Sequence, residues 1–131
     1  YTALVSGGFT AFSVPVGEFL GFDEQHANIL HEENGIFTGQ VIDPILGKNE
    51  KVNRLKSLVK DRGLSQRDVL AVGDGANDLG MLEIAGMGVA MHPKPIVAEK
   101  CDIVINHCDL TSLLYLQGYT KEEFVGTKTK S

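Results

Sequence analysis

The chain has 131 residues, the length of one small domain, and 43% of them are hydrophobic, which is enough for a buried core. The net charge of −5 excludes the strongly basic surface by which proteins bind nucleic acids or acidic membranes. No apolar run approaches the length of a membrane span and no signal peptide opens the sequence, so we expect a cytoplasmic protein that binds neither nucleic acid nor membranes.

Residues 1–5 predict a short buried strand, and Ser6-Gly7-Gly8-Phe9-Thr10 follows it. A hydroxyl and bare backbone N–H groups ahead of a helix can cradle a phosphate, helped by the positive end of that helix. An ordinary Ser/Thr cap after a glycine turn is the alternative. Because Tyr1 is not a start methionine and the strand begins almost at once, we expect the chain to be the C-terminal part of a longer protein.

Residues 10–20 are expected to form an amphipathic helix. Its large apolar residues share one side: Phe12, Val16, Phe19 and Leu20. Pro15 is best tolerated in the first turn of a helix, so the helix is expected to start late or to bend there. Gly21 is suited to end it, because glycine readily adopts the left-handed conformation of a C-terminal cap.

Residues 27–42 predict a β-hairpin, because Asn34-Gly35 is a strong signal for a type I′ turn between two strands. Residues 48–62 predict an amphipathic helix that ends at Gly63. Its inward side is expected to hold Val52, Leu55, Leu58 and Val59. A cation is needed near a bound phosphate and neighbouring carboxylates to offset their repulsion, and the lysines of this helix are the candidates.

Residues 69–85 contain a strand, a polar glycine turn and a helix in succession. The apolar residues 69–72 predict a strand buried on both faces. Gly73 and Gly75 then allow a tight turn, and a helical pattern starts at Leu79. The turn therefore lies at the carboxyl end of a strand, where open α/β sheets bind their ligands.

The same turn carries three side chains with oxygen atoms: Asp74, Asn77 and Asp78. Oxygen ligands suit Mg²⁺, which takes one or two protein carboxylates and keeps positions for water and phosphate. The spacing does not fit a calcium loop, which needs alternating acidic residues and a later glutamate. The alternative is that Asp74 and Asn77 only cap the next helix.

The rest of the chain continues the alternation of strands and helices. We expect strands at 88–91 and 103–105, a helix across 96–100, a closing helix at 110–116 and a polar, frayed tail at 118–131. Cys101 and Cys108 have neither zinc nor redox spacing and are expected to be reduced thiols. The alternation predicts an α/β fold, with a Rossmann-like three-layer parallel sheet, helices on both faces and the hairpin as a small insertion.

The block Gly-Asp-Gly-Ala-Asn-Asp at 73–78 resembles the fourth motif of the haloacid dehalogenase superfamily of aspartyl-phosphate phosphotransferases. Ser-Gly-Gly-Phe at 6–9 resembles the second motif of its phosphoserine phosphatases. The resemblance implies that Asp74 and Asp78 hold or orient Mg²⁺ and that Asn77 lies near the phosphate. It also implies that Ser6 and Gly7 bind the phosphoryl group. The spacing of the third motif selects Lys51 as the phosphate lysine, with Lys48 as the alternative.

The first motif of that superfamily, Asp-x-Asp-x-Thr/Val, contains the nucleophile, and no such run occurs in this chain. The resemblance therefore implies that residues 1–131 are the C-terminal part of a core domain without its first strand and its cap. The intact protein would hydrolyse O-phosphoserine to serine and phosphate through an aspartyl-phosphate, in serine biosynthesis, and this chain alone would be inactive. The missing N-terminal part or a second copy would complete the sheet, unless the flanking strands close on each other. A related small-molecule phosphomonoesterase or phosphotransferase, or a non-catalytic phosphate- or metal-binding module, remains open.

Overall fold

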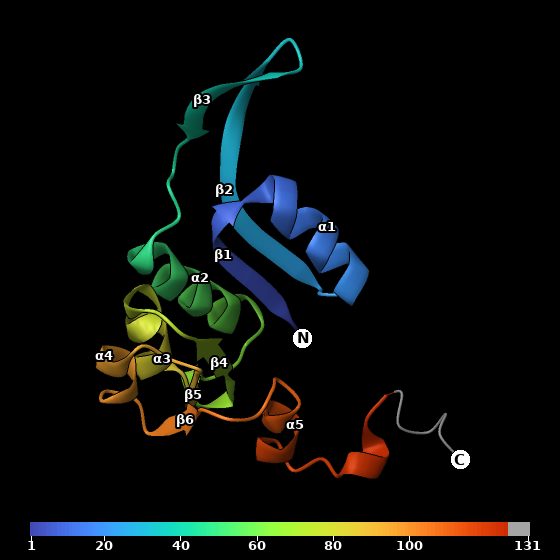
Figure 1. Ribbon diagram of the computed structural model, residues 1–131, viewed down its shortest axis with the longest axis vertical. Coiled ribbons are helices and arrows are strands. Elements are labelled where there is room, and N and C mark those ends of the chain that lie inside the picture. Colours follow the sequence, from blue (N-terminus) through green and yellow to red (C-terminus); the bar gives the residue numbers. More distant parts are fainter. Residues whose placement is uncertain (126–131) are drawn as a thin grey trace. The chain divides into compact units, whose positions relative to one another are not determined.

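The computed structural model describes residues 1–125 and has an α/β fold (Figure 1). It divides into two compact units, Tyr1–Leu64 and Ser65–Ser131. Each unit has its own three-stranded sheet, with strand orders β1-β2-β3 and β4-β5-β6. The α/β class is thus confirmed, whereas the strands that we expected in one parallel sheet form two sheets.

The first unit contains β1 (Ala3–Phe9), α1 (Thr10–Leu20), β2 (Glu24–Glu33), β3 (Ile36–Ile42) and α2 (Lys48–Asp61). Its sheet is mixed, because β2 pairs in parallel with β1 along its first half and antiparallel with β3 along its second half. The parallel register shifts between Val5, opposite His26, and Phe9, opposite Asn28. The chain between these two pairs therefore leaves the regular ladder.

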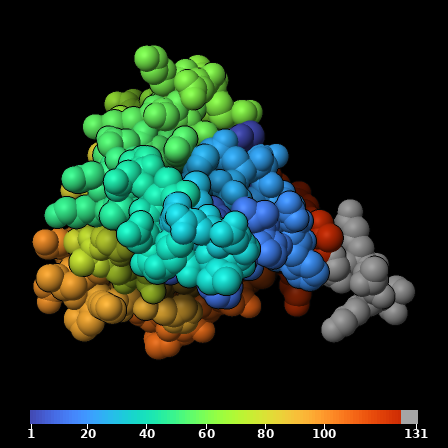
Figure 2. Space-filling view, turned by 90° about the horizontal axis from the view of Figure 1, so that it is seen from above, coloured from blue at the N-terminus to red at the C-terminus, as the bar shows by residue number. Residues whose placement is uncertain are grey.

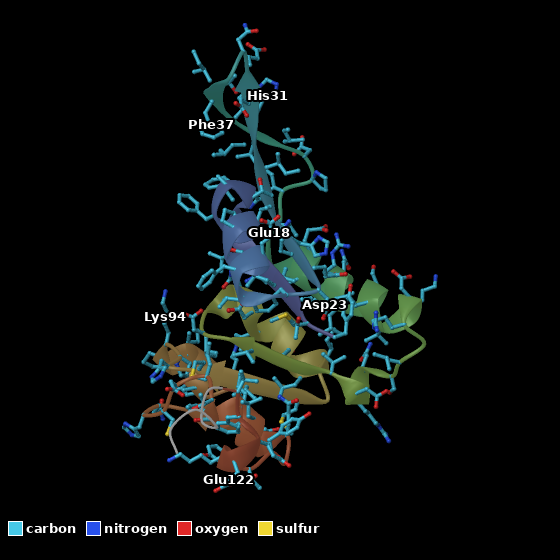
Figure 3. The ribbon with its side chains drawn as sticks, turned by 90° about the vertical axis from the view of Figure 1, so that its right-hand side faces the viewer. Glu18, Asp23, His31, Phe37, Lys94 and Glu122 are labelled. Carbon is cyan, nitrogen blue, oxygen red and sulfur yellow. The ribbon has the colours of Figure 1, made fainter. Side chains whose placement is uncertain are left out.

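The predicted hairpin is confirmed, and Figure 2 looks down onto it, with α1 beside it. Asn34 and Gly35 have φ angles of 53° and 80°, as a type I′ turn requires. The first strand begins at Glu24, earlier than predicted, because its first residues pair with β1 rather than with the hairpin partner. His31 and Phe37 lie towards the tip of the hairpin, and Phe37 is exposed (Figure 3).

Helix α1 has the predicted bounds, Thr10–Leu20, and Pro15 lies inside it, so the late start that we considered because of Pro15 is wrong. Gly21 ends it with a φ angle of 75°, as expected of a left-handed cap. The helix approaches the sheet through small residues, since Ser13 and Gly17 are buried and a Cβ on Gly17 would lie 3.3 Å from Cβ of Gln25. Its large apolar residues are exposed instead: Phe12, Val16, Phe19 and Leu20.

The second unit contains β4 (Leu70–Gly73), α3 (Leu79–Ile84), β5 (Met87–Met91), α4 (Pro95–Ala98), β6 (Ile103–Ile105) and α5 (Ser112–Leu116), with short 3₁₀ turns at Gln66–Asp68, Ala76–Asp78 and Lys121–Glu123. All its strand pairs are parallel, as predicted. Val89, Ala90 and Val97 are fully buried and form the centre of its core.

The C-terminal tail was predicted to be polar and frayed from residue 118. Up to residue 125 the tail is not frayed throughout, because the 3₁₀ turn Lys121–Glu123 is formed and the Phe124 ring centroid lies 5.0 Å from that of Tyr115. The remaining part of the predicted tail, 126–131, lies outside the described residues. No helix within residues 1–125 is long and apolar enough to cross a membrane.

Candidate active site

Ser6, Gly7 and Gly8 lie in the segment of β1 where the ladder with β2 is interrupted. The Ser6 hydroxyl oxygen accepts a hydrogen bond of 2.9 Å from the Gly8 amide. Ser6 is half-buried, whereas both glycines are exposed. The segment therefore presents backbone without side chains at the end of a strand and directly before α1, as a phosphate loop needs.

Lys51 lies in the first turn of α2, and its amide donates to the carbonyl of Gly47 at 3.2 Å. Its side chain is only 8% exposed, whereas Lys48 is exposed. Lysines are rarely buried unless their charge is balanced, so burial distinguishes Lys51 from its neighbour. The buried position favours Lys51 over Lys48 as a fixed cation, and its role toward phosphate stays a prediction.

Asn28 joins these two segments and was not singled out by the sequence analysis. It is 6% exposed, and its amide nitrogen donates to the carbonyls of Gly7 at 2.9 Å and Leu46 at 3.4 Å. Its oxygen accepts a bond of 2.6 Å from the Leu46 amide. Since Leu46 directly precedes the N-cap of α2, one side chain links the predicted phosphate loop to the helix of Lys51. An asparagine inside a strand carried no recognisable signal in the sequence, because its partners are 18 and 21 residues away.

The turn after β4 is closed by Asp78, which is 5% exposed. Its Oδ2 accepts bonds from the amides of Asp74, at 3.0 Å, and Gly75, at 3.2 Å. A Cβ at position 73 would lie 2.5 Å from Cβ of Asp78, so only glycine allows this approach. Asp78 therefore shapes the turn, and Gly73 is required for close packing rather than for a positive φ angle.

Asp74 and Asn77 are exposed in the same turn. The Asp74 carbonyl accepts a bond of 3.3 Å from the amide of Lys94, which ties the turn to the segment after β5. The predicted site residues are thus distributed over both units, with Ser6, Gly7 and Lys51 in the first and Asp74, Asn77 and Asp78 in the second. The side chain that closes the turn is Asp78, whereas Asp74 and Asn77 keep their oxygen atoms at the surface.

No group of three or more His, Cys, Asp or Glu side chains that could hold a metal ion occurs within residues 1–125. Mg²⁺ can bind with fewer protein ligands than such a group provides, because one or two carboxylates suffice when water and phosphate complete its coordination shell. Asp74 offers an exposed carboxylate at the carboxyl end of a parallel strand, and Asp78 fixes the backbone around it. The residues present are therefore compatible with Mg²⁺.

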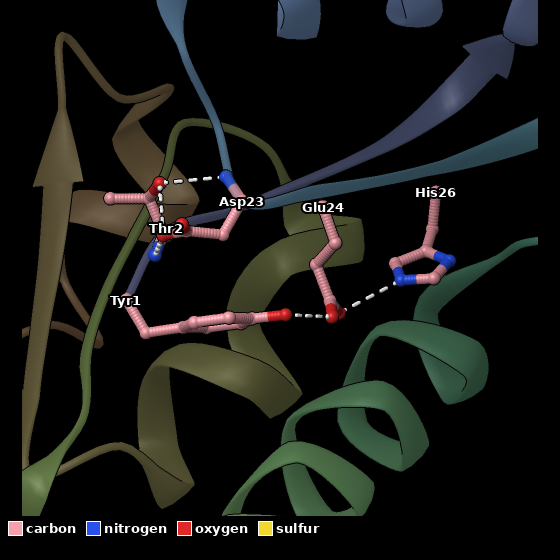
Figure 4. Close-up of polar contacts among 5 residues, drawn as sticks. All are labelled: Tyr1, Thr2, Asp23, Glu24 and His26. Atoms are coloured by element: carbon pink, nitrogen blue, oxygen red, sulfur yellow. Dashed lines mark hydrogen bonds and ion pairs between the residues drawn. The ribbon is translucent and has the colours of Figure 1, made fainter.

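A second polar cluster ties the start of β1 to β2 (Figure 4). The Tyr1 hydroxyl donates to Glu24 at 2.6 Å, and the His26 ring lies 2.9 Å from the other oxygen of that carboxylate. Burial opposes the charge on Glu24, but hydrogen bonds from Tyr1 and His26 leave its pKa below the ordinary value. The Arg62 guanidinium lies 3.7 Å from the centroid of the Tyr1 ring, so the cluster also reaches the end of α2.

Residues 1–83 match the model of the haloacid dehalogenase-like hydrolases. The chain is 42% identical over 115 residues to the phosphoserine phosphatase of Haemophilus influenzae, a match that covers 88% of this chain and 37% of that protein. It is also 42% identical over 112 residues to the phosphoserine phosphatase of Methanocaldococcus jannaschii, covering 86% of this chain and 53% of the relative.

Solved structures of phosphoserine phosphatases are also similar to this chain. A probable phosphoserine phosphatase from Vibrio cholerae superposes with a TM-score of 0.85 at 36% identity, over 88% of this chain and 36% of that one. A substrate-bound phosphoserine phosphatase superposes with a TM-score of 0.80 at 41% identity, over 87% of this chain and 54% of that one. The chain thus spans between about a third and about a half of the length of these proteins. The family model matches more than half of the chain and includes both glycine-containing segments of the site, so the protein belongs to the haloacid dehalogenase-like hydrolase family.

Proposed function

We propose that this chain supplies phosphate- and Mg²⁺-binding residues to a phosphoserine phosphatase that hydrolyses O-phosphoserine through an aspartyl-phosphate. The nucleophilic aspartate lies in a segment that this sequence does not contain, because no Asp-x-Asp-x-Thr/Val run occurs in it. The observation that carries the proposal is the turn from Gly73 to Asp78 at the carboxyl end of β4, in a chain about 40% identical to phosphoserine phosphatases. In the proposal the enzyme works in the cytoplasm, in serine biosynthesis.

The proposed roles follow from charge and position. Ser6, the Gly7 backbone and the Lys51 ammonium bind the phosphoryl oxygens, whose negative charge a cation and N–H groups stabilise. Asp74 binds Mg²⁺, Asp78 holds the turn that presents Asp74, and Asn77 contacts the phosphate. Mg²⁺ bound there supplies positive charge that neutralises the phosphoryl oxygens during transfer.

The same proposal accounts for the edge of the second sheet. β1 and β4 are edge strands of their sheets, and within residues 1–125 each pairs with a neighbouring strand on one side only. β4 reads Leu-Ala-Val-Gly and lacks the charged residues or proline that usually protect an edge strand. In the proposal, a strand that carries the nucleophile pairs with β4 and extends the parallel sheet of the second unit. The missing N-terminal part or a second copy of the chain supplies this strand.

The test is a fusion in which a segment with an Asp-x-Asp-x-Thr/Val run precedes Tyr1. We expect Mg²⁺-dependent hydrolysis of O-phosphoserine by the fusion. Asp74→Asn and Lys51→Ala should each lower kcat by about 100-fold, because each removes charge that stabilises the transferring phosphoryl group. Asp102→Asn is the matched control, since this exposed carboxylate lies at the opposite end of the second sheet and should change kcat less than about twofold.

Other outcomes would point to other functions. A fusion that hydrolyses other small phosphomonoesters but not phosphoserine would identify a related phosphomonoesterase. The absence of the nucleophile from this sequence favours one further candidate, a non-catalytic phosphate- or metal-binding module. A folded fusion that binds phosphate and Mg²⁺ without turnover would support that candidate and contradict the enzyme.

A further inference from the structure

His92 adopts a left-handed backbone conformation, which is uncommon for residues other than glycine. Among the described residues, only Asn34 and His92 have positive φ angles without being glycine, at 53° and 44°. Asn34 is explained by the hairpin turn, and asparagine tolerates this region well. His92 directly follows β5 and belongs to no hairpin. A strained residue of this kind persists only where surrounding interactions hold it in place.

Two hydrogen bonds hold His92, and both acceptors are carbonyl groups at the end of β6 or just after it. Its amide donates to the carbonyl of Ile105 at 2.7 Å, at the end of the β5–β6 ladder. Its ring nitrogen Nε2 lies 2.7 Å from the carbonyl of Cys108. Because a carbonyl oxygen can only accept, Nε2 carries the proton and donates it. The side chain therefore fastens the segment after β6 to the segment after β5.

The segment that His92 fixes also reaches the predicted metal-binding turn. Lys94 lies two residues further on, and its amide donates to the carbonyl of Asp74 at 3.3 Å. Lys94 is also the N-cap of α4, and its side chain is exposed and projects away from the ribbon (Figure 3). Residues 92–94 thus connect the carboxyl ends of β4, β5 and β6 through backbone groups. His92 and the carbonyl of Asp74 are thus joined through the backbone to the amide of Lys94.

We propose that His92 is a positioning residue for the Asp74 turn, acting through its Nε2 bond to Cys108 and through the amide of Lys94. The proposal rests on the proposed function for the role of Asp74 in binding Mg²⁺. The hydrogen bonds from His92 to Cys108 and from Lys94 to Asp74 lie within the second unit, and they do not depend on that function. The ring is needed as a hydrogen-bond donor of the right reach.

The experiment compares three variants of the 131-residue chain by amide hydrogen exchange and by titration with Mg²⁺ alone. His92→Gly relieves the positive φ angle and removes the donor, whereas His92→Gln keeps a donor of similar reach. Asn34→Gly is the matched control, because it relieves a similar φ angle in the first unit. We expect His92→Gly to speed exchange at the Lys94 amide and to weaken Mg²⁺ binding, each by about fivefold, the effect of losing one net hydrogen bond. His92→Gln should stay within about twofold of the wild type, and Asn34→Gly should leave both readouts unchanged.

The outcomes separate this proposal from the proposed function. If His92→Gly changes only the melting temperature and leaves both local readouts at wild-type values, the positioning role is overturned. Equal effects of the Gly and Gln substitutions would overturn the hydrogen bond as its cause. If the wild-type chain binds no Mg²⁺, the proposed function loses its metal site, while exchange at Lys94 still decides whether His92 positions the turn.

Discussion

At the scale of single residues, two buried polar side chains, Asn28 and Asp78, bind backbone groups. Asn28 binds Gly7 and Leu46, and Asp78 binds the amides of Asp74 and Gly75. Each closes a segment that contains predicted site residues. An unsatisfied buried donor or acceptor is expensive, so such side chains determine loop geometry strongly.

Asn28→Ala is expected to lower the free energy of unfolding of the first unit by about 2 kcal/mol, because it leaves the Gly7 carbonyl and the Leu46 amide without their partner. Ser13→Ala is the matched control, since Ser13 is equally buried and donates one bond of 2.5 Å to Gln25. It should lower stability by about 1 kcal/mol. Urea denaturation measures both, and equal values for the two variants would contradict the linking role of Asn28.

Asp23 gives the molecule a defined response to acid. Hydrogen bonds from the amide and the hydroxyl of Thr2, at 2.6 and 3.1 Å, lower the pKa of this carboxyl below its ordinary value of 3.8 (Figure 4). A lowered pKa in the folded state means that the carboxylate stabilises the fold above pH 3.8. That contribution is lost as the pH falls through the lower, folded-state value.

Asp23→Asn should therefore lower the melting temperature near neutral pH, and the difference from the wild type should disappear as the pH falls through the folded-state pKa of Asp23. Melting curves over this pH range measure the effect. Asp61→Asn removes the same charge from the exposed end of α2 and serves as the control. A difference for Asp23→Asn that stays constant as the pH falls through that pKa would show that the Thr2 bonds do not act through the ionised carboxylate.

At the scale of elements, helix α1 has the bounds predicted from the sequence, but the exposure of its side chains was not predicted. Its bounds and its C-cap agree with the sequence, but its small residues face the sheet and its large apolar residues are exposed. Phe19 is 89% exposed and Phe12 is 73% exposed. Amphipathic spacing predicts that these side chains share a side, and it does not predict which neighbour covers that side.

The turn between β4 and α3 depends on the absence of a side chain at position 73. Gly73→Ala should lower the free energy of unfolding of the second unit by about 2 kcal/mol or more, because the new Cβ would overlap the Asp78 side chain. It should also release the amides of Asp74 and Gly75 from the Asp78 carboxylate, which increases their hydrogen exchange.

Gly47→Ala is the control for this substitution, because nothing lies within 4 Å of a Cβ placed there and its φ angle of −126° suits alanine. It should change stability by less than about 0.5 kcal/mol. Unaltered exchange at Asp74 and Gly75 in Gly73→Ala would mean that Asp78 does not hold the turn.

At the scale of the whole molecule, the chain belongs to the haloacid dehalogenase-like hydrolases, and its sequence contains no Asp-x-Asp-x-Thr/Val run that would hold a nucleophile. We therefore expect the purified 131-residue chain to release no phosphate from O-phosphoserine above background in the presence of Mg²⁺. An aspartyl-phosphate cannot form without the attacking carboxylate, whatever the remaining residues bind. A phosphate-release assay measures this, with Asp74→Asn as the control for contaminating phosphatases. Turnover that Asp74→Asn abolishes would contradict the expectation.

The sequence by itself determined the features that depend on neighbours along the chain. The hairpin at Asn34-Gly35, the end of α1 at Gly21 and the turn of residues 73–78 follow from local backbone requirements, and each is found as predicted. The family was also recognisable, because its motifs are short runs whose order and spacing are visible without a structure. The roles of Ser6, Lys51 and Asp74 toward phosphate and Mg²⁺ stay predictions.

Only the tertiary structure decided which distant residues meet. The link from Gly7 through Asn28 to Leu46, the contact of Lys94 with Asp74, and the exposure of the large α1 side chains involve partners about 20 residues apart or packing between elements. Periodicity shows which side of an element is apolar, but the identity of the packing partner depends on how the whole chain closes its loops. For that reason the folded chain was needed to show that the flanking strands do not close on each other and that the strands form two sheets.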